Sequence, residues 1–291
     1  MGRLENRGVE FLIDANIFPT QNEFQWNASF NISKNTNKIL EIITEEDIIY
    51  SSNLDASIQT RVSVGQPIGS FYGWKTDGIY NDQAELDAGP VYTGAEVGDI
   101  KIVDTNNDGV VNEDDQTFIG NPEPDFIYGF SNKFSYKNFT LDMHFQGVSG
   151  ASVANLNNFY LAAPHARTNK LTELTDVWTP TNTDAKYPKP GIQDGFGTTG
   201  NDMYIVEDAS YLRLKNVSLA YLFNKIPVNG IESLKLYVSA SNLFTITNYT
   251  GFNPDVNGDV ARGGNGNTRS GIDLGTYPLA RTFLFGFNIN F

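Results

Sequence analysis

Apolar and polar residues alternate with a period of two in seven stretches of the chain. The stretches cover residues 9–17, 24–33, 126–136, 139–146, 211–223, 234–241 and 282–291. Such alternation is typical of a β-strand with one apolar and one polar face. In the last stretch, for example, Phe283, Phe285 and Phe287 share a face. In the fifth, the apolar phase slips near Lys215 and Asn216, which predicts a β-bulge. The chain is therefore predicted to be all-β.

The predicted strands are about ten residues long, whereas strands of globular proteins usually have about five or six residues. A strand of about nine to eleven residues can cross a bilayer at a tilt. The apolar faces are rich in Phe, Tyr and Trp, and the opposite faces are rich in Asn, Ser, Gln and Thr. In an outer-membrane barrel the apolar face meets lipid and the polar face lines a wet lumen. In a soluble β-sandwich the apolar face points to a core, so alternation alone leaves both folds open.

The connections between the stretches alternate between short and long. The short ones are residues 18–22, residues 137–138 and about ten residues around 227–230, and the long ones are 34–124, 148–208 and 246–278. Short periplasmic turns and long external loops are typical of outer-membrane barrels. This parity predicts that the last strand runs toward the periplasm. Within the second long connection, residues 171–178 have a helical pattern.

Composition and charge exclude several function classes. The chain has 291 residues, a net charge of −14, no cysteine and two histidines, His144 and His165. Disulfide scaffolds and thiolate chemistry are excluded, and nucleic acid is an unsuitable partner because phosphate binding needs clustered basic residues. No nucleophile elbow, phosphate loop or dinucleotide fingerprint is present. We expect His144, with Asp142 and Gln146 on the same polar face, to line a lumen and contact substrate rather than act as a base. His165 has no obvious partner.

An acidic segment contains the clearest motif. Residues 81–124 hold eleven acidic side chains and one basic side chain. Residues 104–115 have the spacing of an EF-hand calcium loop, with oxygen donors at positions 1, 3 and 5, Gly at position 6 and a carboxylate at position 12. The predicted Ca²⁺ ligands are Asp104, Asn106, Asp108, the Val110 carbonyl and Asp115. The alternative is an Asp/Asn/Gly turn without metal. A second run, residues 255–259, lacks the glycine at position 6 and is interpreted as a turn.

Several longer motifs then identify a family. They include Gly65-Gln66-Pro67-Ile68-Gly69-Ser70-Phe71-Tyr72-Gly73-Trp74 and residues 2–10, 77–80, 98–101, 119–122, 125–130, 207–217, 239–244 and 275–291. With these motifs the chain resembles the C-terminal part of a SusC/RagA-type TonB-dependent outer-membrane transporter of the Bacteroidetes. The terminal Phe291, with Ile289 and Gly286, is similar to the signal that the barrel assembly machinery reads. Leu284 departs from it, because a polar residue is usual at that position.

The resemblance implies a fold and a set of partners. The fold would be the last seven or so strands of a large antiparallel transmembrane β-barrel of the plugged 22-stranded class, with long extracellular loops. Residues 1–291 would be the C-terminal portion of that barrel, without plug or N-terminal strands, and residues 34–124 would be a long acidic extracellular loop. We therefore expect a fragment of a longer protein. Its expected surroundings are the outer-membrane lipid, a SusD-like surface lipoprotein, and TonB acting through the plug.

The expected function is active import of glycan oligomers or peptides at the outer membrane, and the protein is not expected to be an enzyme. One alternative is a secreted, soluble, carbohydrate-binding β-sandwich with the calcium loop as a structural site. Another is a glycosidase, which would need two carboxylates about 5–10 Å apart in a cleft. The sequence indicates no preferred pair of carboxylates.

Overall fold

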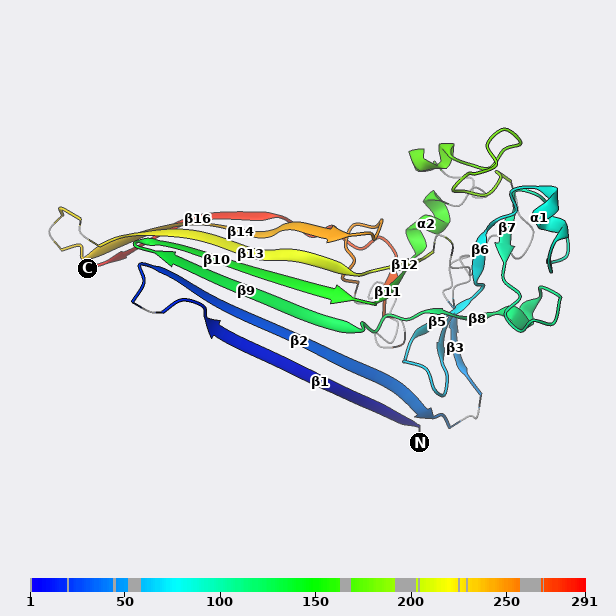
Figure 1. Ribbon diagram of the computed structural model, residues 1–291, viewed down its shortest axis with the longest axis horizontal. Helices are drawn as coiled ribbons and strands as arrows, with labels where there is room; N and C mark the ends of the chain where they lie inside the picture. The colour runs from blue at the N-terminus through cyan, green and yellow to red at the C-terminus, as the bar shows by residue number, and fades with distance from the viewer. Residues whose placement is uncertain are drawn as a thin grey trace.

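Seven long antiparallel strands form one sheet in the computed structural model (Figure 1). The structure describes residues 2–19, 21–43, 46–51, 59–162, 169–191, 203, 205–224, 226–228, 230–256, 268 and 270–291. The strands, in their order across the sheet, are β1 (Arg3–Asn16), β2 (Phe24–Glu41), β9 (Phe126–Tyr136), β10 (Phe139–Ser149), β13 (Tyr211–Phe223), β14 (Ser233–Thr247) and β16 (Thr282–Asn290). Each corresponds to one predicted stretch, so the seven predicted strands are confirmed. The predicted bulge is confirmed as well, because the pairing of β13 with β14 shifts register between Leu214 and Asn216.

The apolar face of this sheet is exposed. The exposed fraction is 67% for Val9, 56% for Phe11 and 78% for Phe285, three side chains from the two edge strands. A β-sandwich would bury such side chains against a second sheet, since its core lies between the two inner faces. The soluble β-sandwich is therefore not supported. No helix among the described residues is long and apolar enough to span a membrane.

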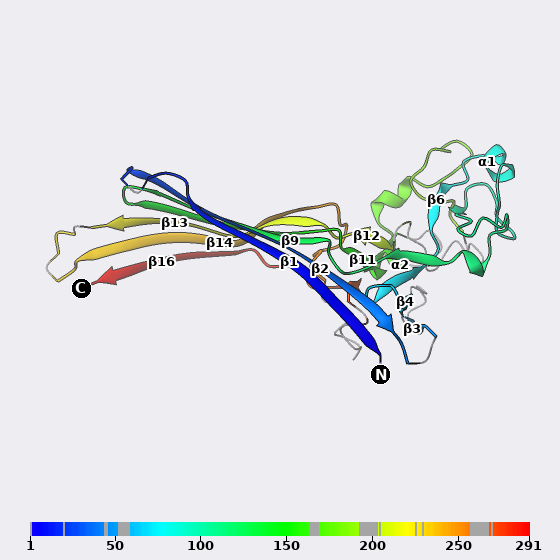
Figure 2. The same cartoon turned by 60° about the horizontal axis from the view of Figure 1, so that its bottom comes forward.

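The short turns lie at one end of the sheet and the long connections gather at the other (Figure 1). The N-terminus lies at the loop end and the C-terminus at the turn end, so the last strand runs in the predicted direction. A second view shows the strongly twisted course of the sheet (Figure 2). One boundary was predicted wrongly: β2 continues to Glu41, so the first long connection begins after residue 41 and not at residue 34.

The long connections have secondary structure of their own. The first contains β3 (Ile48–Ser51), β4 (Gln59–Val62), β5 (Ser70–Gly73), β6 (Thr76–Ile79), α1 (Gln83–Asp87), β7 (Ile100–Ile102), η1 (Glu113–Asp115) and β8 (Thr117–Gly120). The second contains β11 (Ser152–Asn155), α2 (Leu156–Leu161), η2 (Thr172–Thr175) and β12 (Val206–Asp208), and the third contains β15 (Ile272–Asp273). The helix predicted over residues 171–178 is only the single 3-10 turn η2, and α2 was not predicted.

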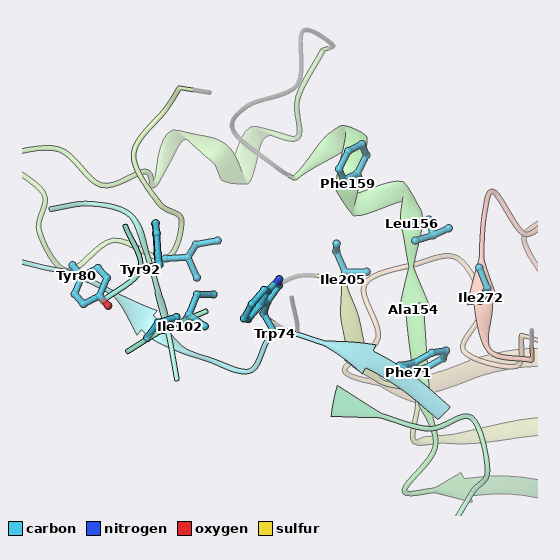
Figure 3. Packing of buried hydrophobic residues seen from close by; sticks show 12 residues of the cluster. Phe71, Trp74, Tyr80, Tyr92, Ile102, Ala154, Leu156, Phe159, Ile205 and Ile272 are labelled. Carbon is cyan, nitrogen blue, oxygen red and sulfur yellow. The ribbon is translucent and has the colours of Figure 1, made fainter. Parts of the chain in front are cut away.

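These connections share one hydrophobic core, which Figure 3 shows in close-up. Phe71 comes from the first connection, Leu156 and Ile205 from the second and Ile272 from the third, and all four are at least 95% buried. The three-stranded sheet β12–β11–β15 joins the second connection to the third. We call the part of the three connections that surrounds this core the loop unit. The acidic segment 81–124 contributes to this core as well, because Tyr92, Ile100 and Val111 are core residues.

Polar contacts also tie the loop unit together. The Glu207 carboxylate accepts hydrogen bonds from Asn155 Nδ2 (2.9 Å), Asn158 Nδ2 (2.8 Å), Thr250 Oγ1 (2.8 Å) and the Thr250 backbone N–H (2.8 Å). It therefore joins the second connection to the third. Asn155 and Asn158 are buried, so these bonds favour a single arrangement, because any other arrangement would leave their amide groups unpaired.

Candidate functional site

The register of the sheet places the polar side chains in rows across the strands. Directly opposed residues point to the same face, and successive residues point to opposite faces. One row contains Asp14, Ser29, Ser131, His144 and Asn216, and the next contains Asn16, Asn27, Lys133, Asp142 and Ser218. The polar face is thus continuous over β1, β2, β9, β10 and β13.

A groove of about 480 Å³ lies over these two rows. Its polar lining consists of Asp14, Asn16, Asn27, Ser29, Ser131, Asn132, Lys133, Asp142, His144, Asn216 and Ser218. Two of the three predicted substrate residues, Asp142 and His144, are therefore brought together. Gln146 lies one row farther toward the loop unit and does not line the groove, and its Oε1 accepts a hydrogen bond from Lys215 Nζ at 2.9 Å.

The groove carries charges without partners. Lys133 and Asp142 are opposed in the register of β9 and β10, yet neither they nor Asp14 form an ion pair with another described residue. Such groups are free to bind a solute with hydrogen-bonding or charged groups. His144 Nδ1 lies 2.8 Å from Ser131 Oγ, so one ring nitrogen is held by the neighbouring strand. His165, the other histidine, lies outside the described residues.

The opposite face has the chemistry of a lipid contact. It runs from Val9 in β1 to Ile17, directly after the strand, which at about 3.4 Å per residue and a tilt of about 40° covers roughly 20–25 Å of bilayer. Near the turns, aromatic rings of neighbouring strands, and one pair within β13, form a belt. Its ring pairs are Phe24–Phe134, Trp26–Phe134, Phe139–Tyr221 and Tyr221–Phe223, with centroids 4.5–6.1 Å apart. Belts of this kind mark the edges of the apolar band in membrane barrels.

The predicted calcium loop closes on itself as its spacing requires. Gly109, at position 6, has φ 88°, which is the left-handed conformation that favours glycine. Asp104 Oδ2 accepts a hydrogen bond from the Gly109 N–H at 2.9 Å, so positions 1 and 6 meet. Asp115 Oδ1 accepts a hydrogen bond from the Thr105 N–H at 2.8 Å, so position 12 lies beside position 2.

The predicted ligands are atoms that a hard cation prefers, but their acidic side chains do not form a compact cluster. The five predicted ligands offer only oxygen atoms, which Ca²⁺ prefers. Among the described residues, however, no three His, Cys, Asp or Glu side chains are grouped closely enough to hold a metal ion. Two of the five ligands, Asn106 and the Val110 carbonyl, are of other types. Calcium binding at residues 104–115 therefore stays a prediction. Of the run 255–259, residues 257–259 lie outside the described residues.

Electrostatic contacts bring the first two long connections together. Lys189 Nζ lies 2.6 Å from Glu96 Oε2 and 3.3 Å from Asp99 Oδ1. The hydrogen bond from Lys189 lowers the pKa of Glu96. Burial, reinforced by the negative charge of Asp99, raises the pKa of Tyr80 and of Tyr92. Both phenols therefore stay neutral over the ordinary pH range.

Comparison with known proteins finds similarity along the whole chain. The chain is 33% identical over 297 residues to TonB-dependent receptor P3 of Formosa agariphila and 27% identical over 304 residues to TonB-dependent receptor SusC of Bacteroides thetaiotaomicron. Both alignments cover all of this chain but only 29% and 27% of the relative. No family model matches the chain.

A solved structure has the same fold. The structure of the RagAB peptide transporter superposes with a TM-score of 0.75 at 24% identity, and the match covers 99% of this chain and 29% of that chain. At this identity the likeness establishes the fold alone. The relatives establish the family: the chain belongs to the TonB-dependent receptors of the SusC/RagA type, which are β-barrel proteins of the cell outer membrane.

Proposed function

We propose that this chain forms part of the wall of an outer-membrane importer for oligomeric nutrients, either peptides or glycans. The observation that carries the proposal is the two-faced sheet, with an exposed apolar face on one side and a groove lined by polar groups on the other. An apolar outer face and a polar inner face are what a transport barrel needs. The relatives are named receptors and, for RagAB, a peptide transporter, so an enzyme is not proposed.

In this proposal the groove contacts cargo that passes through the lumen. Asp142, Lys133 and His144 offer an anion, a cation and an imidazole within two adjacent rows. They suit weak, reversible contacts with amide or hydroxyl groups, because none of them is enclosed. We keep Gln146 as a secondary contact, since Lys215 already occupies its side-chain oxygen.

The proposed partners follow the topology. A SusD-like surface lipoprotein would cover the loop unit, which lies at the external end of the sheet. TonB would supply energy through a plug that these 291 residues do not include. Phe291, directly after β16, would be read by the barrel assembly machinery.

The function is tested by deleting the gene in its source bacterium and following uptake of fluorescently labelled peptides and oligosaccharides. We expect uptake of one class to fall to background and to return on complementation. Asp142→Asn should lower uptake several-fold, whereas Asp184→Asn, which removes an exposed loop charge outside the groove, should leave it unchanged. Uptake of both cargo classes at the wild-type rate in the deletion strain would contradict the proposal.

Calcium binding by residues 104–115 is a second proposal, of a structural site that stiffens the first long connection. The loop closure between Asp104, Gly109 and Asp115 supports it. We expect Ca²⁺ to raise the protease resistance of residues 95–120, and Asp104→Ala to abolish that protection. Asp114→Ala, which removes an acidic side chain outside the predicted ligand set, should keep it. Identical digestion with Ca²⁺ and with a chelator would remove the assignment.

A further inference from the structure

Charged side chains on the outer, apolar face of the sheet gather at one place, where β1 and β2 lie near the loop unit (Figure 1). In the register of these two strands, Lys34 is opposed to Val9, and Lys38 is opposed to Glu5. Arg7 lies between Glu5 and Val9 on β1, and alternate residues of a strand share a face. These charged residues therefore point to the same side as the exposed apolar stripe. We name them the rim cluster, which consists of Glu5, Arg7, Lys34 and Lys38.

The rim cluster has no counterpart on the outer face of the other five strands. The outward positions of β9, β10, β13, β14 and β16 carry no charged residue. Arg3 and Glu41, at the ends of β1 and β2, are opposed, and their charges offset each other. The cluster has three cations and one anion, so a charge of +2 remains in a chain whose net charge is −14. Positive charge concentrated at one level of this surface favours an anionic ligand.

The cations of the cluster are available to a ligand. Lys34 and Lys38 are exposed, and neither forms an ion pair with another described residue. Arg7 Nη2 lies 2.8 Å from Glu5 Oε2, but 76% of the Arg7 side chain is exposed. Because an exposed ion pair contributes little to stability, Arg7 can exchange Glu5 for a stronger acceptor. A phosphate is such an acceptor, since a guanidinium can donate two parallel hydrogen bonds to it.

The depth of the cluster matches the headgroup layer of a bilayer. The apolar stripe ends at Val9, and the Lys34 ammonium lies 5.2 Å from the centroid of the outward-facing Phe126 ring. Arg7 lies two residues beyond Val9, or about 5 Å along the membrane normal at a tilt of about 40°. Lys38 lies four residues beyond Lys34, or about 10 Å along the normal. The headgroup layer outside the hydrocarbon is about 5–7 Å thick, so Arg7 and Lys34 lie within it and Lys38 can reach it with its flexible stem.

The surface has two adjoining parts, one cationic and one apolar. Val9, which is 67% exposed, and Phe126, which is 39% exposed, continue the cationic part into the apolar stripe. A soluble anion would use only the cationic part, and a soluble acidic protein could not cover the part that faces hydrocarbon. A lipid with a phosphate headgroup uses both parts, because its headgroup is anionic and its chains are apolar.

We propose that the rim cluster binds the anionic phosphate headgroup of a membrane lipid in the leaflet nearest the loop unit. The phosphate lies between Arg7 and Lys34, and an acyl chain lies along Val9 and Phe126. Lys38 covers the headgroup from the aqueous side. The site concerns the surrounding membrane and not the cargo, so the inference goes beyond the proposed import function and does not depend on it.

The test uses the complete receptor, purified in detergent and freed of native lipid. Native mass spectrometry measures its affinity for dioleoyl phosphatidic acid and for dioleoyl phosphatidylcholine, which has the same chains and no net charge. We expect a preference of about tenfold or more for phosphatidic acid, because each basic residue near a membrane surface contributes about fivefold. Arg7→Gln and Lys34→Gln should each lower the preference about three- to fivefold, and the double variant should nearly abolish it.

Two matched variants separate this site from a general effect of charge or folding. Lys137→Gln removes a cation at the turn end of the sheet, where Lys137 Nζ lies 3.8 Å from Glu23 Oε2, and should leave the preference unchanged. Lys34→Arg keeps the charge and should keep the preference. Because the substituted side chains are exposed, every variant should melt at the temperature of the wild type.

Inorganic phosphate distinguishes a lipid site from a site for a free anion. In large excess it should not displace phosphatidic acid, because it lacks the chain that lies on the apolar stripe. Equal affinity of the wild-type receptor for the two lipids, an unaltered preference in the double variant, or full displacement by inorganic phosphate would overturn the inference. None of these measurements involves uptake, so their failure would leave the proposed function untouched.

Discussion

The sheet and the loop unit bury their apolar side chains in different ways. In the loop unit, Phe71, Leu156 and Ile272 are at least 95% buried, as in a water-soluble domain. In the sheet, Phe283, Phe285 and Phe287 expose 59–78% of their surface. The described chain contains a hydrophobic core for one region and none of comparable size for the other. The apolar face of the sheet is therefore not covered by the described chain, and the hydrocarbon of a bilayer can cover it.

The two regions should differ in what stabilises them. The loop unit is stabilised by burial of apolar side chains from water, so its stability depends on close packing. The sheet depends on a match between its outer face and lipid, where a charge costs more than a cavity. We therefore expect the loss of a buried side chain to be the most destabilising change in the loop unit, and the introduction of a charge to be the most destabilising change on the outer face of the sheet.

The largest expected effect is in the loop core. Phe71→Ala should destabilise the loop unit by about 3–5 kcal/mol, because it removes a fully buried ring and leaves a cavity. Phe252→Ala, at a loop phenylalanine that is 73% exposed, should cost less than about 0.5 kcal/mol. Hydrogen exchange of the receptor in detergent measures both. Equal protection of the loop amides in the two variants would show that the loop unit has no such core.

The next effect separates the two faces of the sheet. Val217→Arg places a charge on the apolar face near the middle of β13 and should cost about 2–4 kcal/mol. Ser218→Arg places the same charge on the polar face and should cost far less. Urea titration of folding into lipid vesicles compares the two. If both substitutions are tolerated equally, the outer face does not meet lipid.

The smallest effect concerns alkaline pH. Burial, together with the hydrogen bond that the Tyr249 hydroxyl donates to Asp273 Oδ2 at 2.6 Å, raises the pKa of Tyr249. A raised pKa means that the stabilisation is complete below the unfolded value of about 10 and is lost as the pH rises above it. The loop unit should therefore become protease-sensitive at strongly alkaline pH.

The matched variants for this titration are Tyr249→Phe and Tyr277→Phe. Tyr249→Phe should flatten the alkaline loss of stability, because the ionising group is gone. Tyr277 is 86% exposed, so Tyr277→Phe should titrate like the wild type. Three superimposable titration curves would exclude Tyr249 as a source of the pH dependence.

The sheet could be predicted from the sequence because its physical rule is local. Period-two alternation fixes which residues share a face, and the break near Lys215 fixes the bulge. The loop unit could not be predicted in the same way. Its strands have two to four residues, too few for a period to show. Phe71, Leu156 and Ile272 meet only through contacts between distant segments.

The candidate site, too, could be predicted from the sequence only in part. Asp142 and His144 could be assigned to the polar face from alternation alone, but the sequence gives no register between strands, so Lys133 and Asp14 were missed as their neighbours.

The two faces of the sheet are tested most directly by measuring the environment of six consecutive residues of β10. The chain has no cysteine, so single cysteines can be introduced at positions 141–146 of the receptor, labelled with a fluorophore and reconstituted into vesicles. We predict that quenching alternates along the strand. A lipid-borne quencher should act at positions 141, 143 and 145, and an aqueous quencher at positions 142, 144 and 146. Quenching without a period of two would contradict the claim that one face of this sheet meets lipid and the other a polar lumen.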